Sequence, residues 1–455
     1  MNTLKSLWTR RGQYGWISIE IIVASAIAFF VLDSIVVSTY DASRPYNYDV
    51  DRLVMVQVSR LDQYHPDYDD TRMRNLDVIE GDIMSIIPGL AELPEVEKAI
   101  PLPIRGFGGG DDSRDDVPLA ESLHVQSFKA TFIPETEFFT TMGIKAASDI
   151  PGNPSIEQMN DMWVNFYDEM ICTRMEARLL HGDEYTAMAK SREAHDTWHA
   201  ANPDLSNPID KLAIVGIVED IRAWGDRPWP LVRFYADPLY HSLQWNNRGV
   251  YNILLRLKKR ENAKSFAHKF NHDPELQKLA RSGVLEFNNA KAYAEFNGAD
   301  TLFSPKERYR NLLVVFFAIN IFLGVFGTFW MLTRKRAEEA GIMRAFGATP
   351  LRVRLMLYVE GSIIALVSSL TGCAIYVYYL SKNPDQFEYG LSGFRAVDME
   401  QIPAELHSWV GDFWAHSAVV SAVVCGLMLI VVLLGIAIPA WKLSHINPVE
   451  ALAEE

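Results

Sequence analysis

Apolar residues gather in four runs, and polar residues fill most of the sequence between the first run and the second. The runs are residues 16–37, 312–333, 357–380 and 417–438. Each is about as long as an α-helix that crosses a hydrocarbon core, which needs roughly 20 residues at about 1.5 Å each. The pattern predicts a membrane protein with four transmembrane helices and one large water-exposed domain between helices 1 and 2.

The first run also resembles the core of a secretory signal peptide, because a basic N-terminus precedes it. Residues 16–37 are longer than such a core, and no small-x-small cleavage site follows before Tyr40. Residues 1–15 carry Lys5, Arg10 and Arg11 together with aromatic side chains that favour a membrane interface. We therefore expect an uncleaved anchor that follows an amphipathic cytoplasmic segment.

The charges between the runs predict the orientation. Residues 334–356 carry Lys and Arg in excess over Glu, and such an excess stays on the cytoplasmic side. We therefore expect residues 1–15, 334–356 and 439–455 in the cytoplasm of a cell (inner) membrane protein. The regions expected outside are residues 38–311 and the acidic loop 381–416.

The large outer region has the mixed pattern of an α+β domain. Alternating or β-branched residues predict strands at 52–59, 123–132, 162–167, 212–221, 230–236 and 251–258. Helical spacing predicts helices at 76–87, 173–194 and 261–281. Pro- and Gly-rich breaks at 101–118 and 148–154 are typical of loops or subdomain borders. The sequence thus predicts an extracytoplasmic domain at 38–289, of one or two subdomains.

Residues 290–311 lead from this domain towards the second run and predict a partly helical stalk. Gly298 and Pro305 favour a break or kink in it.

Composition alone would have suggested a soluble protein, because 22% of the 455 residues are charged and the net charge is −14. Cys373 and Cys425 fall in apolar runs, which leaves Cys172 as the single cysteine of the outer region. We expect no disulfide inside that region, so its stability must come from an apolar core. We expect no nucleic-acid partner.

No motif indicates an enzyme. The chain lacks the GxxxxGK[ST] phosphate loop of an ATPase. The segment GFGGGDDSRDD at 106–116 lacks the ligand spacing of a calcium loop and favours a solvated loop. His195 and His199 have the four-residue spacing of zinc ligands but lack the Glu of zinc proteases, so a surface helix is favoured. We expect no catalytic, cofactor-binding or metal-binding residue.

Ionisable residues inside the apolar runs need a physical reason, because charge in lipid is costly. Glu20, Asp33 and Glu360 each lie within about two turns of a predicted helix end. Interfacial anchoring, or pairing with a polar group of a neighbouring helix, is favoured over a proton or ion pathway. Asn320 is expected to form a hydrogen bond across a helix interface. Gly324 with Gly327, or Gly426 with Gly435, would permit close helix contact.

The basic segment between the second and third runs carries a recognisable motif. Its residues are Glu339, Gly341, Ile342, Arg344, Ala345, Gly347, Ala348 and Thr349. They resemble the motif E-x-G-[IV]-x-[RK]-A-x-G-A-[ST] of MacB/FtsX-like ABC transporter permeases. The C-terminal residues Pro439, Ala440, Pro448, Ala451 and Leu452 are similar to that family's ending. Residues 214–222, IVGIVEDIR, resemble its outer-domain strand VVGVVxDxR.

The match has two departures in sequence and one in organisation. Ala340 stands where the family usually has Ile, and Leu443 where its ending commonly has Ala. The macrolide exporter MacB carries an ATPase at the N-terminus of the same chain, whereas only about 15 residues precede the first run here. We therefore expect the nucleotide-binding subunit to be a separate polypeptide.

The resemblance implies a type VII, mechanotransmitting permease that itself binds no cofactor. A separate ABC ATPase would bind ATP and Mg, and a second permease chain, identical or paralogous, would pair with this one in the lipid membrane. A periplasmic adaptor or outer-membrane component is a further partner that the resemblance allows. The coupling residues would be Glu339, Gly341, Ile342, Arg344, Ala345, Gly347, Ala348, Thr349, Pro439, Pro448, Ala451 and Leu452.

The residues themselves fit this role. A helix over about 335–346, stopped at Gly347, would dock into a groove on an ATPase. The alternative for this helix is a basic segment that lies on anionic lipid. The alternatives for the whole chain are a membrane-anchored sensor or adhesion protein without an ATPase, and a membrane-bound hydrolase. The size of the outer domain favours a macrolide-exporter-like or lipoprotein-release-like module, and the sequence leaves the substrate open.

Overall fold

The computed structural model describes most of the chain, in several stretches. They are residues 11–43, 45–103, 114–120, 123–203, 205, 207–222, 231–244, 249–296, 337–383, 409–410 and 412–445, with scattered residues between 312 and 331.

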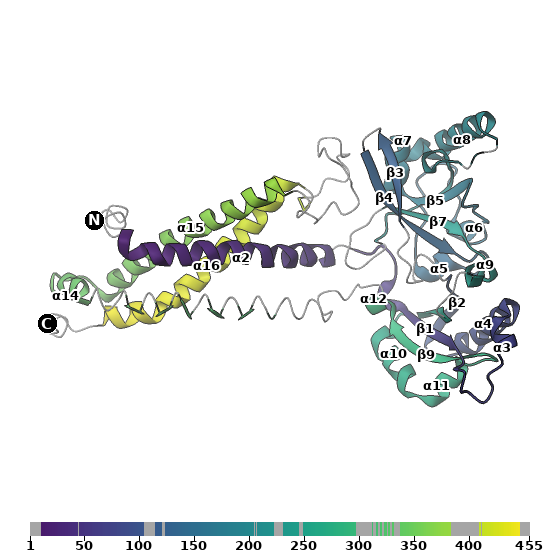
Figure 1. Cartoon of the computed structure of the whole chain (residues 1–455), viewed down its shortest axis with the longest axis horizontal. Coiled ribbons are helices and arrows are strands. Elements are labelled where there is room, and N and C mark those ends of the chain that lie inside the picture. The colour runs from purple at the N-terminus through teal and green to yellow at the C-terminus, as the bar shows by residue number, and fades with distance from the viewer. Residues whose placement is uncertain are drawn as a thin grey trace. The chain divides into compact units, whose positions relative to one another are not determined.

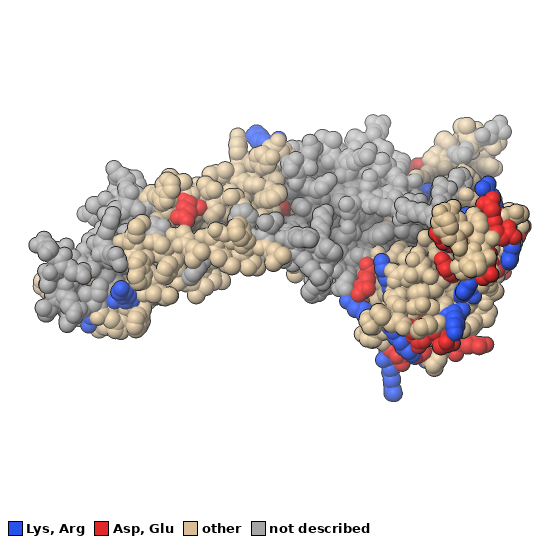
Figure 2. Space-filling view, turned by 60° about the horizontal axis from the view of Figure 1, so that its bottom comes forward, with Lys and Arg blue, Asp and Glu red and all other residues tan. Residues whose placement is uncertain are grey.

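The chain divides into two compact units, which are described separately. The helical unit comprises Met1–Tyr40, Leu302–Leu391 and Ser408–Glu455, and the α+β unit comprises Asp41–Thr301 and Ser392–His407. Charged side chains crowd the described surface of the α+β unit, whereas that of the helical unit is mostly uncharged (Figure 2). This division agrees with the expected separation of apolar runs from a polar domain.

The α+β unit contains two sheets, and the first, sheet A, is antiparallel with the order β2-β8-β1-β9. Its strands are β1 (Leu53–Arg60), β2 (Val96–Pro101), β8 (Val250–Leu257) and β9 (Leu285–Ala292). Along β1, Leu53 and Met55 enter one hydrophobic core, while Val54 and Val56 enter another. Successive side chains of a strand point to opposite faces, so sheet A is buried on both faces.

Helices cover one face of sheet A (Figure 1). They are α4 (Leu76–Ala91), α9 (Leu239–Gln244), α10 (Ala263–His272) and α11 (Pro274–Leu279). Ile79, Ile83, Ile86 and Leu90 recur at helical spacing along α4 and are buried in this core. Asn75, after the short α3 (Asp70–Arg74), caps α4 by accepting a hydrogen bond from the Asp77 backbone N–H.

The second sheet, sheet B, is mixed and has the order β3-β4-β7-β5-β6. Its strands are β3 (Arg114–Ala120), β4 (Leu123–Phe132), β5 (Glu169–Thr173), β6 (Ala213–Val218) and β7 (Val232–Ala236). β4 pairs with β7, and β5 with β6, in parallel. One hydrophobic core contains an aromatic cluster of Phe132, Phe138, Phe139 and Phe234. The side chains on the second face of sheet A are buried in the same core.

Four helices accompany sheet B: α5 (Phe138–Met142), α6 (Ile156–Asn160), α7 (Arg174–His181) and α8 (Glu184–Ala201). The helix expected over 173–194 is in fact two helices. Gly182 ends α7 in the left-handed conformation, with φ 77°, and Asp183 caps α8. The helix expected over 261–281 is likewise divided, at Asp273, into α10 and α11.

Several other expectations for this unit are wrong. Residues 162–165 have no regular secondary structure and 166–167 begin a turn, so the expected strand is absent there, and Trp163, Phe166 and Tyr167 are exposed. Residues 114–116 of the expected loop 106–116 begin β3, while 106–113 lie outside the described residues. The expected stalk starts too early, because 290–292 end β9 and the next residues form α12 (Tyr293–Phe296). The strands β2, β3, β5 and β9 were not predicted from the sequence.

The helical unit has three helices long and apolar enough to span a membrane among the residues described. The candidate spans are Gly15–Asp33, Pro350–Lys382 and Phe413–Lys442. They lie in α2 (Arg11–Ser43), α15 (Pro350–Lys382) and α16 (Phe413–Ser444) (Figure 1). Half of the run expected at 312–333 lies outside the described residues, as do all of the stalk residues 297–311 and most of the loop 381–416.

A shared apolar core joins these helices. It contains residues of α2, α15 and α16, and also Ala340 of the short α14 (Ala337–Ala345). α15 begins at Pro350, seven residues before the span expected at 357–380, and α16 extends past 417–438 at both ends. Both helices are therefore longer than the apolar runs that predicted them.

Candidate functional site

The connection between α14 and α15 is built from the motif residues 344–350. Gly347 is left-handed, with φ 87°, and its backbone N–H donates to the carbonyl of Arg344 over 2.9 Å. The Ala348 N–H donates to the carbonyl of Met343 over 3.0 Å. This pair of hydrogen bonds is the Schellman motif, which satisfies the last carbonyls of a helix and requires a residue that tolerates positive φ. The expected helix stop at Gly347 is confirmed.

The next helix starts at once. Thr349 is the N-cap of α15, its hydroxyl accepts from the Arg352 backbone N–H, and Pro350 takes the first helical position. The letters G-A-T-P thus encode one helix end and one helix start with no free linker between them. Hydrogen bonds at the end of α14 and at the start of α15 therefore hold every residue of the connection.

The two faces of α14 differ. Ala340 is fully buried in the apolar core of α15 and α16, so the small side chain in place of the family's Ile sits in a packed position. Phe346 at the tip is 89% exposed, and Leu351 in the first turn of α15 is 62% exposed. Exposed apolar surface of this kind is compatible with contact with another protein or with lipid.

A polar contact ties the start of α15 to the end of α16. Arg354 Nε donates to Ser444 Oγ over 2.8 Å, and the Ser444 hydroxyl donates to the Trp441 carbonyl over 2.8 Å. An Arg354 terminal nitrogen lies 3.3 Å from His445 Nε2. The contact of Arg354 with Ser444 was not predicted from the sequence, because residues 90 positions apart share no local pattern. Their contact joins the two segments that carry the family motifs.

We name the α14 tip, the start of α15 and the end of α16 the coupling site. Of the predicted coupling residues, it holds Ile342, Arg344, Ala345, Gly347, Ala348, Thr349 and Pro439. Glu339 and Gly341 belong to the backbone of α14, while Pro448, Ala451 and Leu452 lie outside the described residues. Their role in coupling stays a prediction.

The ionisable residues in the apolar helices are buried or packed against neighbours. Asp33 pairs with His416 of α16, so the favoured interpretation for Asp33, a polar partner on a neighbouring helix, is confirmed. Glu360 is buried on α15. Glu20 lies against Gly324, whose missing side chain makes room for the Glu20 carboxylate. Asn320 Nδ2 donates to the carbonyl of Phe316 four residues earlier, which is a local bond rather than the expected cross-helix one.

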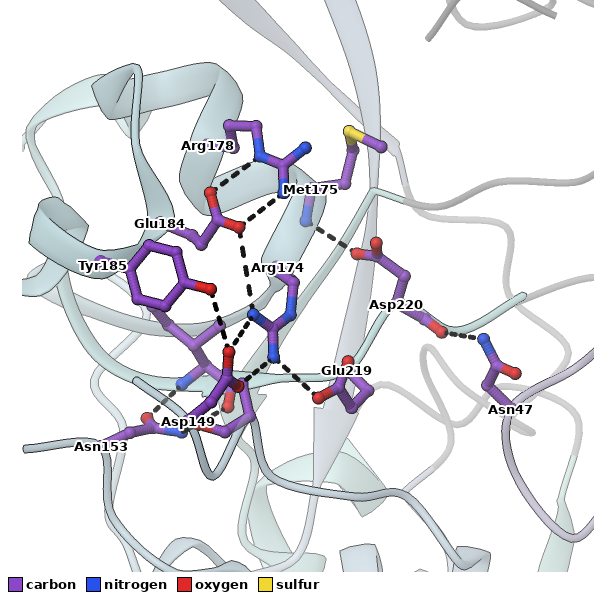
Figure 3. Close-up of polar contacts among 12 residues, drawn as sticks. Asn47, Asp149, Asn153, Arg174, Met175, Arg178, Glu184, Tyr185, Glu219 and Asp220 are labelled. Atoms are coloured by element: carbon purple, nitrogen blue, oxygen red, sulfur yellow. Dashed lines mark hydrogen bonds and ion pairs between the residues drawn. The ribbon is translucent and has the colours of Figure 1, made fainter. Parts of the chain in front are cut away.

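In the α+β unit, the segment IVGIVEDIR runs along β6 and holds the chain that comes from α2. Asn47 Nδ2 donates to the backbone carbonyl of Asp220 over 2.7 Å (Figure 3). The Arg222 N–H donates to the carbonyl of Tyr46 over 3.1 Å, and the Arg222 guanidinium lies 4.5 Å from the centre of the Tyr46 ring. The Asp and Arg of this family-like segment thus fix the first residues of the unit.

The Asp220 carboxylate has a second role at the start of α7. It accepts a hydrogen bond from the Met175 backbone N–H over 2.7 Å, as a carboxylate at a helix N-terminus does. Burial nevertheless raises the pKa of Asp220 above its ordinary value.

A paired charge cluster surrounds Arg174 at the same place (Figure 3). Arg174 donates to both carboxylate oxygens of Asp149, over 3.0 and 2.5 Å, and to Glu219 over 2.8 Å. The Tyr185 hydroxyl also donates to Asp149, over 3.1 Å. Hydrogen bonds from Arg174 lower the pKa of Asp149 to about 2. Arg174 thus pairs with two carboxylates at once, which is the arrangement of a structural ion-pair network.

Where the unit ends, its first and last described residues meet through aromatic rings. Tyr48 lies 5.7 Å from Tyr46 and 6.3 Å from Tyr293 of α12, and Tyr293 lies 6.4 Å from Phe296, all between ring centres. Tyr293 is fully buried, and burial raises the pKa of its hydroxyl. The segments through which the chain enters and leaves the unit are therefore packed together.

The expected surface helix around His195 and His199 is α8, where the two rings stack 5.9 Å apart. Within the described stretches, no three His, Cys, Asp or Glu side chains gather in a way that could hold a metal ion. Cys172 is a free, buried thiol in β5.

Comparison with known proteins finds a family match for part of the chain. Residues 311–448 match the family described as FtsX-like permease C-terminal. No curated protein matches the chain. Two solved structures are similar to part of it, and both are less than 15% identical to it.

The first is a domain of a permease protein from Porphyromonas gingivalis, with 13% identity, 53% of this chain and 91% of that chain covered, and a TM-score of 0.28. The second is the periplasmic region of MacB from Actinobacillus actinomycetemcomitans, with 12% identity, 55% and 94% covered, and a TM-score of 0.22. TM-scores this low support no conclusion about the fold. The description of the α+β unit therefore depends on its own sheets alone.

Proposed function

We propose that this chain is the membrane subunit of an ABC transporter driven by a separate ATPase. The proposal starts from the match of residues 311–448 to the family described as FtsX-like permease C-terminal. In this proposal the ATPase binds ATP and Mg and docks at the coupling site. The permease passes the resulting movement to its α+β unit, which exports, extracts or releases a substrate outside the cytoplasm.

The observation that carries the proposal is the rigid, exposed tip between α14 and α15. Phe346 and Leu351 project apolar surface from a connection that backbone hydrogen bonds at Gly347 and Thr349 hold in shape. An apolar anchor on a rigid support suits docking into a groove, because little conformational entropy is lost on binding. A mobile loop with the same residues would transmit no force.

Movement of this tip reaches two long helices. α14 packs on α15 and α16 through Ala340, and Arg354 links the start of α15 to the end of α16. α15 has 33 residues, so as a straight helix it extends for about 50 Å. A displacement of the first turn of α15 would thus move residues at the far end of the same helix.

The α+β unit supports the last step of the proposal. The chain from α2 is pinned at Tyr46 and Asn47 to the end of β6, and the segment leaving the unit packs against it at Tyr293. Both connections therefore hold the same corner of the unit. A second permease chain would complete the assembly, and the substrate would not need to pass between the spanning helices.

Reconstitution of the full chain with its ATPase tests the proposal. Phe346→Glu places a charge in the proposed groove, and Gly347→Val cannot keep the left-handed helix stop. We expect each variant to lower ATPase stimulation and transport at least tenfold, while Tyr64→Ala, which removes an aromatic ring that is 86% exposed in the α+β unit, leaves both unchanged. Unimpaired transport by Phe346→Glu and Gly347→Val would refute the coupling role. A chain that copurifies with no ATPase would favour the anchored sensor instead.

A further inference from the structure

Two of the three cysteines of the chain meet inside the helical unit. Cys373 of α15 is 2% exposed, Cys425 of α16 is 8% exposed, and both belong to the apolar core that the helices share. The Cys373 thiol lies within hydrogen-bonding distance of the Cys425 thiol and of the Ser421 hydroxyl, which is one turn earlier on α16. Cys373 therefore packs against two successive turns of the neighbouring helix.

The register of α15 against α16 accounts for this meeting. Arg354, near the start of α15, contacts Ser444 at the end of α16, so the two helices run in opposite directions. Cys373 lies 19 residues after Arg354, and Cys425 lies 19 residues before Ser444. Because both helices rise about 1.5 Å per residue, the two cysteines are at the same level of the helix pair. The contact at the helix ends and the contact of the thiols thus agree on one register.

The two thiols are far from the ends of their candidate membrane spans. Cys373 precedes the last residue of α15 by about 14 Å, and Cys425 follows the first residue of α16 by about 18 Å. Charge is costly at such a depth in lipid, so charged, water-soluble oxidants are excluded. Two thiols and a disulfide are both uncharged, and either state of the pair is therefore compatible with this environment. Two thiolates around a monovalent metal ion would instead leave a net negative charge there.

We propose that Cys373 and Cys425 are a thiol pair that a lipid-soluble quinone oxidises to a disulfide. In this reaction both S–H bonds break and one S–S bond forms. The two electrons and two protons pass to the quinone, which becomes a hydroquinone. The disulfide joins α15 covalently to α16 in the interior of the helical unit. The packing of the two helices then depends on the redox state of the membrane.

Access and geometry both support the reaction. Cys425 has the larger exposed fraction of the two cysteines, and the next residue, Gly426, is exposed, with no atom within 4 Å of the place a Cβ would take. A quinone dissolved in lipid therefore reaches the pair from the side of Cys425. Because the two thiols are already in contact, a small approach of the sulfur atoms brings them to the S–S bond length of about 2.0 Å.

The test counts the thiols of the full chain in lipid nanodiscs before and after addition of a fully substituted benzoquinone, whose ring has no free position to which a thiol could add. The chain is then denatured and labelled with a maleimide. We expect the count to fall from three thiols to one, and dithiothreitol added after denaturation to restore all three. Three thiols remaining after the quinone would overturn the proposal and leave both cysteines as apolar packing residues.

Variants show which thiols react. Cys172→Ser removes the thiol of the α+β unit, and its count should fall from two to none, whereas Cys373→Ser should keep both of its thiols. The double variant Cys425→Ser with Gly426→Cys retains three thiols but turns one of them by about 100° around α16 into open space, so it should form no disulfide. Disulfide formation by this double variant at the unmodified yield would overturn the facing geometry.

The effect on function rests on the proposed coupling to an ATPase and is measured separately. α15 and α16 both reach the coupling site, so a covalent bond between them should lower ATPase stimulation by roughly tenfold or more in the oxidised chain. Cys373→Ser treated with the same quinone should keep its stimulation. Full stimulation by a chain whose thiol count has fallen to one would refute a restraint by the disulfide. Absence of stimulation in the reduced chain would contradict the proposed function, while the thiol count would still decide on the redox pair.

Discussion

At the residue scale, the motif letters correspond to backbone requirements more than to chemistry. Gly347 is needed for a positive φ at a helix stop, and Thr349 and Pro350 for the helix start that follows. In the outer-domain segment, Asp220 accepts from the first turn of α7 and Arg222 bonds the chain at Tyr46. These residues position elements, so replacing one changes geometry before it changes any reaction.

The charge cluster at Arg174 predicts an acid-sensitive contact. The folded-state pKa of Asp149, about 2, lies below its ordinary value of 3.8, so the Arg174–Asp149 pair stabilises the fold above about pH 4. That stabilisation is lost as the pH falls through about 2. We expect Asp149→Asn to lower the thermal unfolding midpoint of the full chain at pH 5 and to reduce its further fall towards pH 2.

Asp196→Asn is the matched control, because Asp196 is an exposed acid on α8 beside His195. It should leave the acid profile unchanged. Identical acid profiles for Asp149→Asn and the unmodified chain would show that the pair contributes nothing to folding.

At the element scale, the contact of α2 with α15 depends on a missing side chain. A Cβ on Gly372 would overlap the backbone carbonyl oxygen of Ile22 and crowd Ser25. Small residues at helix interfaces in membranes let backbones approach in this way. The sequence reading considered Gly324, Gly327, Gly426 and Gly435 for this role and passed over Gly372. Nothing within 4 Å would meet a Cβ on Gly426 in this chain.

We predict that Gly372→Ala destabilises the helical unit by about 1–3 kcal/mol, because the backbones must move apart to admit the methyl group. Gly426→Ala, in open space on α16, should be neutral or stabilising by up to about 1 kcal/mol. The measurement is thermal unfolding in nanodiscs, together with cross-linking between cysteines introduced on α2 and α15. A cross-linking yield that Gly372→Ala leaves unchanged would contradict the close approach.

At the scale of the whole molecule, sheet A joins the two cores of the α+β unit. Met55, Leu254 and Ile100 lie side by side on neighbouring strands, and all three enter the core that also holds sheet B. Val56 and Leu255, one position along, enter the core under α4 and α10. Sheet A therefore contributes side chains to the cores of both expected subdomains. We expect the two subdomains to unfold together.

Leu254→Ala tests this. Leu254 is fully buried, so the cavity should cost about 2–5 kcal/mol. Amide hydrogen exchange in the full chain should speed up in both sheets, while Leu205→Ala, at an exposed site, should change neither. Faster exchange confined to one sheet would mean that the cores unfold separately.

The sequence by itself determined the division into apolar runs and a polar domain, because burial in lipid and burial in a core leave different run lengths. It also determined the Gly347 stop, since few residues tolerate positive φ. Local pattern also predicted five of the strands. β1, β4, β6, β7 and β8 are rich in β-branched residues or alternate between apolar and polar residues. The strand expected at 162–167 is wrong, because its aromatic residues are exposed in an irregular segment and the turn that follows it.

Only the tertiary structure decided which distant residues meet. β9 is polar along much of its length and becomes a strand because β1 offers an edge to pair with. Asp33 and His416 are 383 positions apart, and Arg354 and Ser444 are 90 apart. A sequence pattern records local periodicity, whereas such pairs depend on how whole helices pack. The contact of Asp33 with His416 and that of Arg354 with Ser444 are therefore visible only in the tertiary structure.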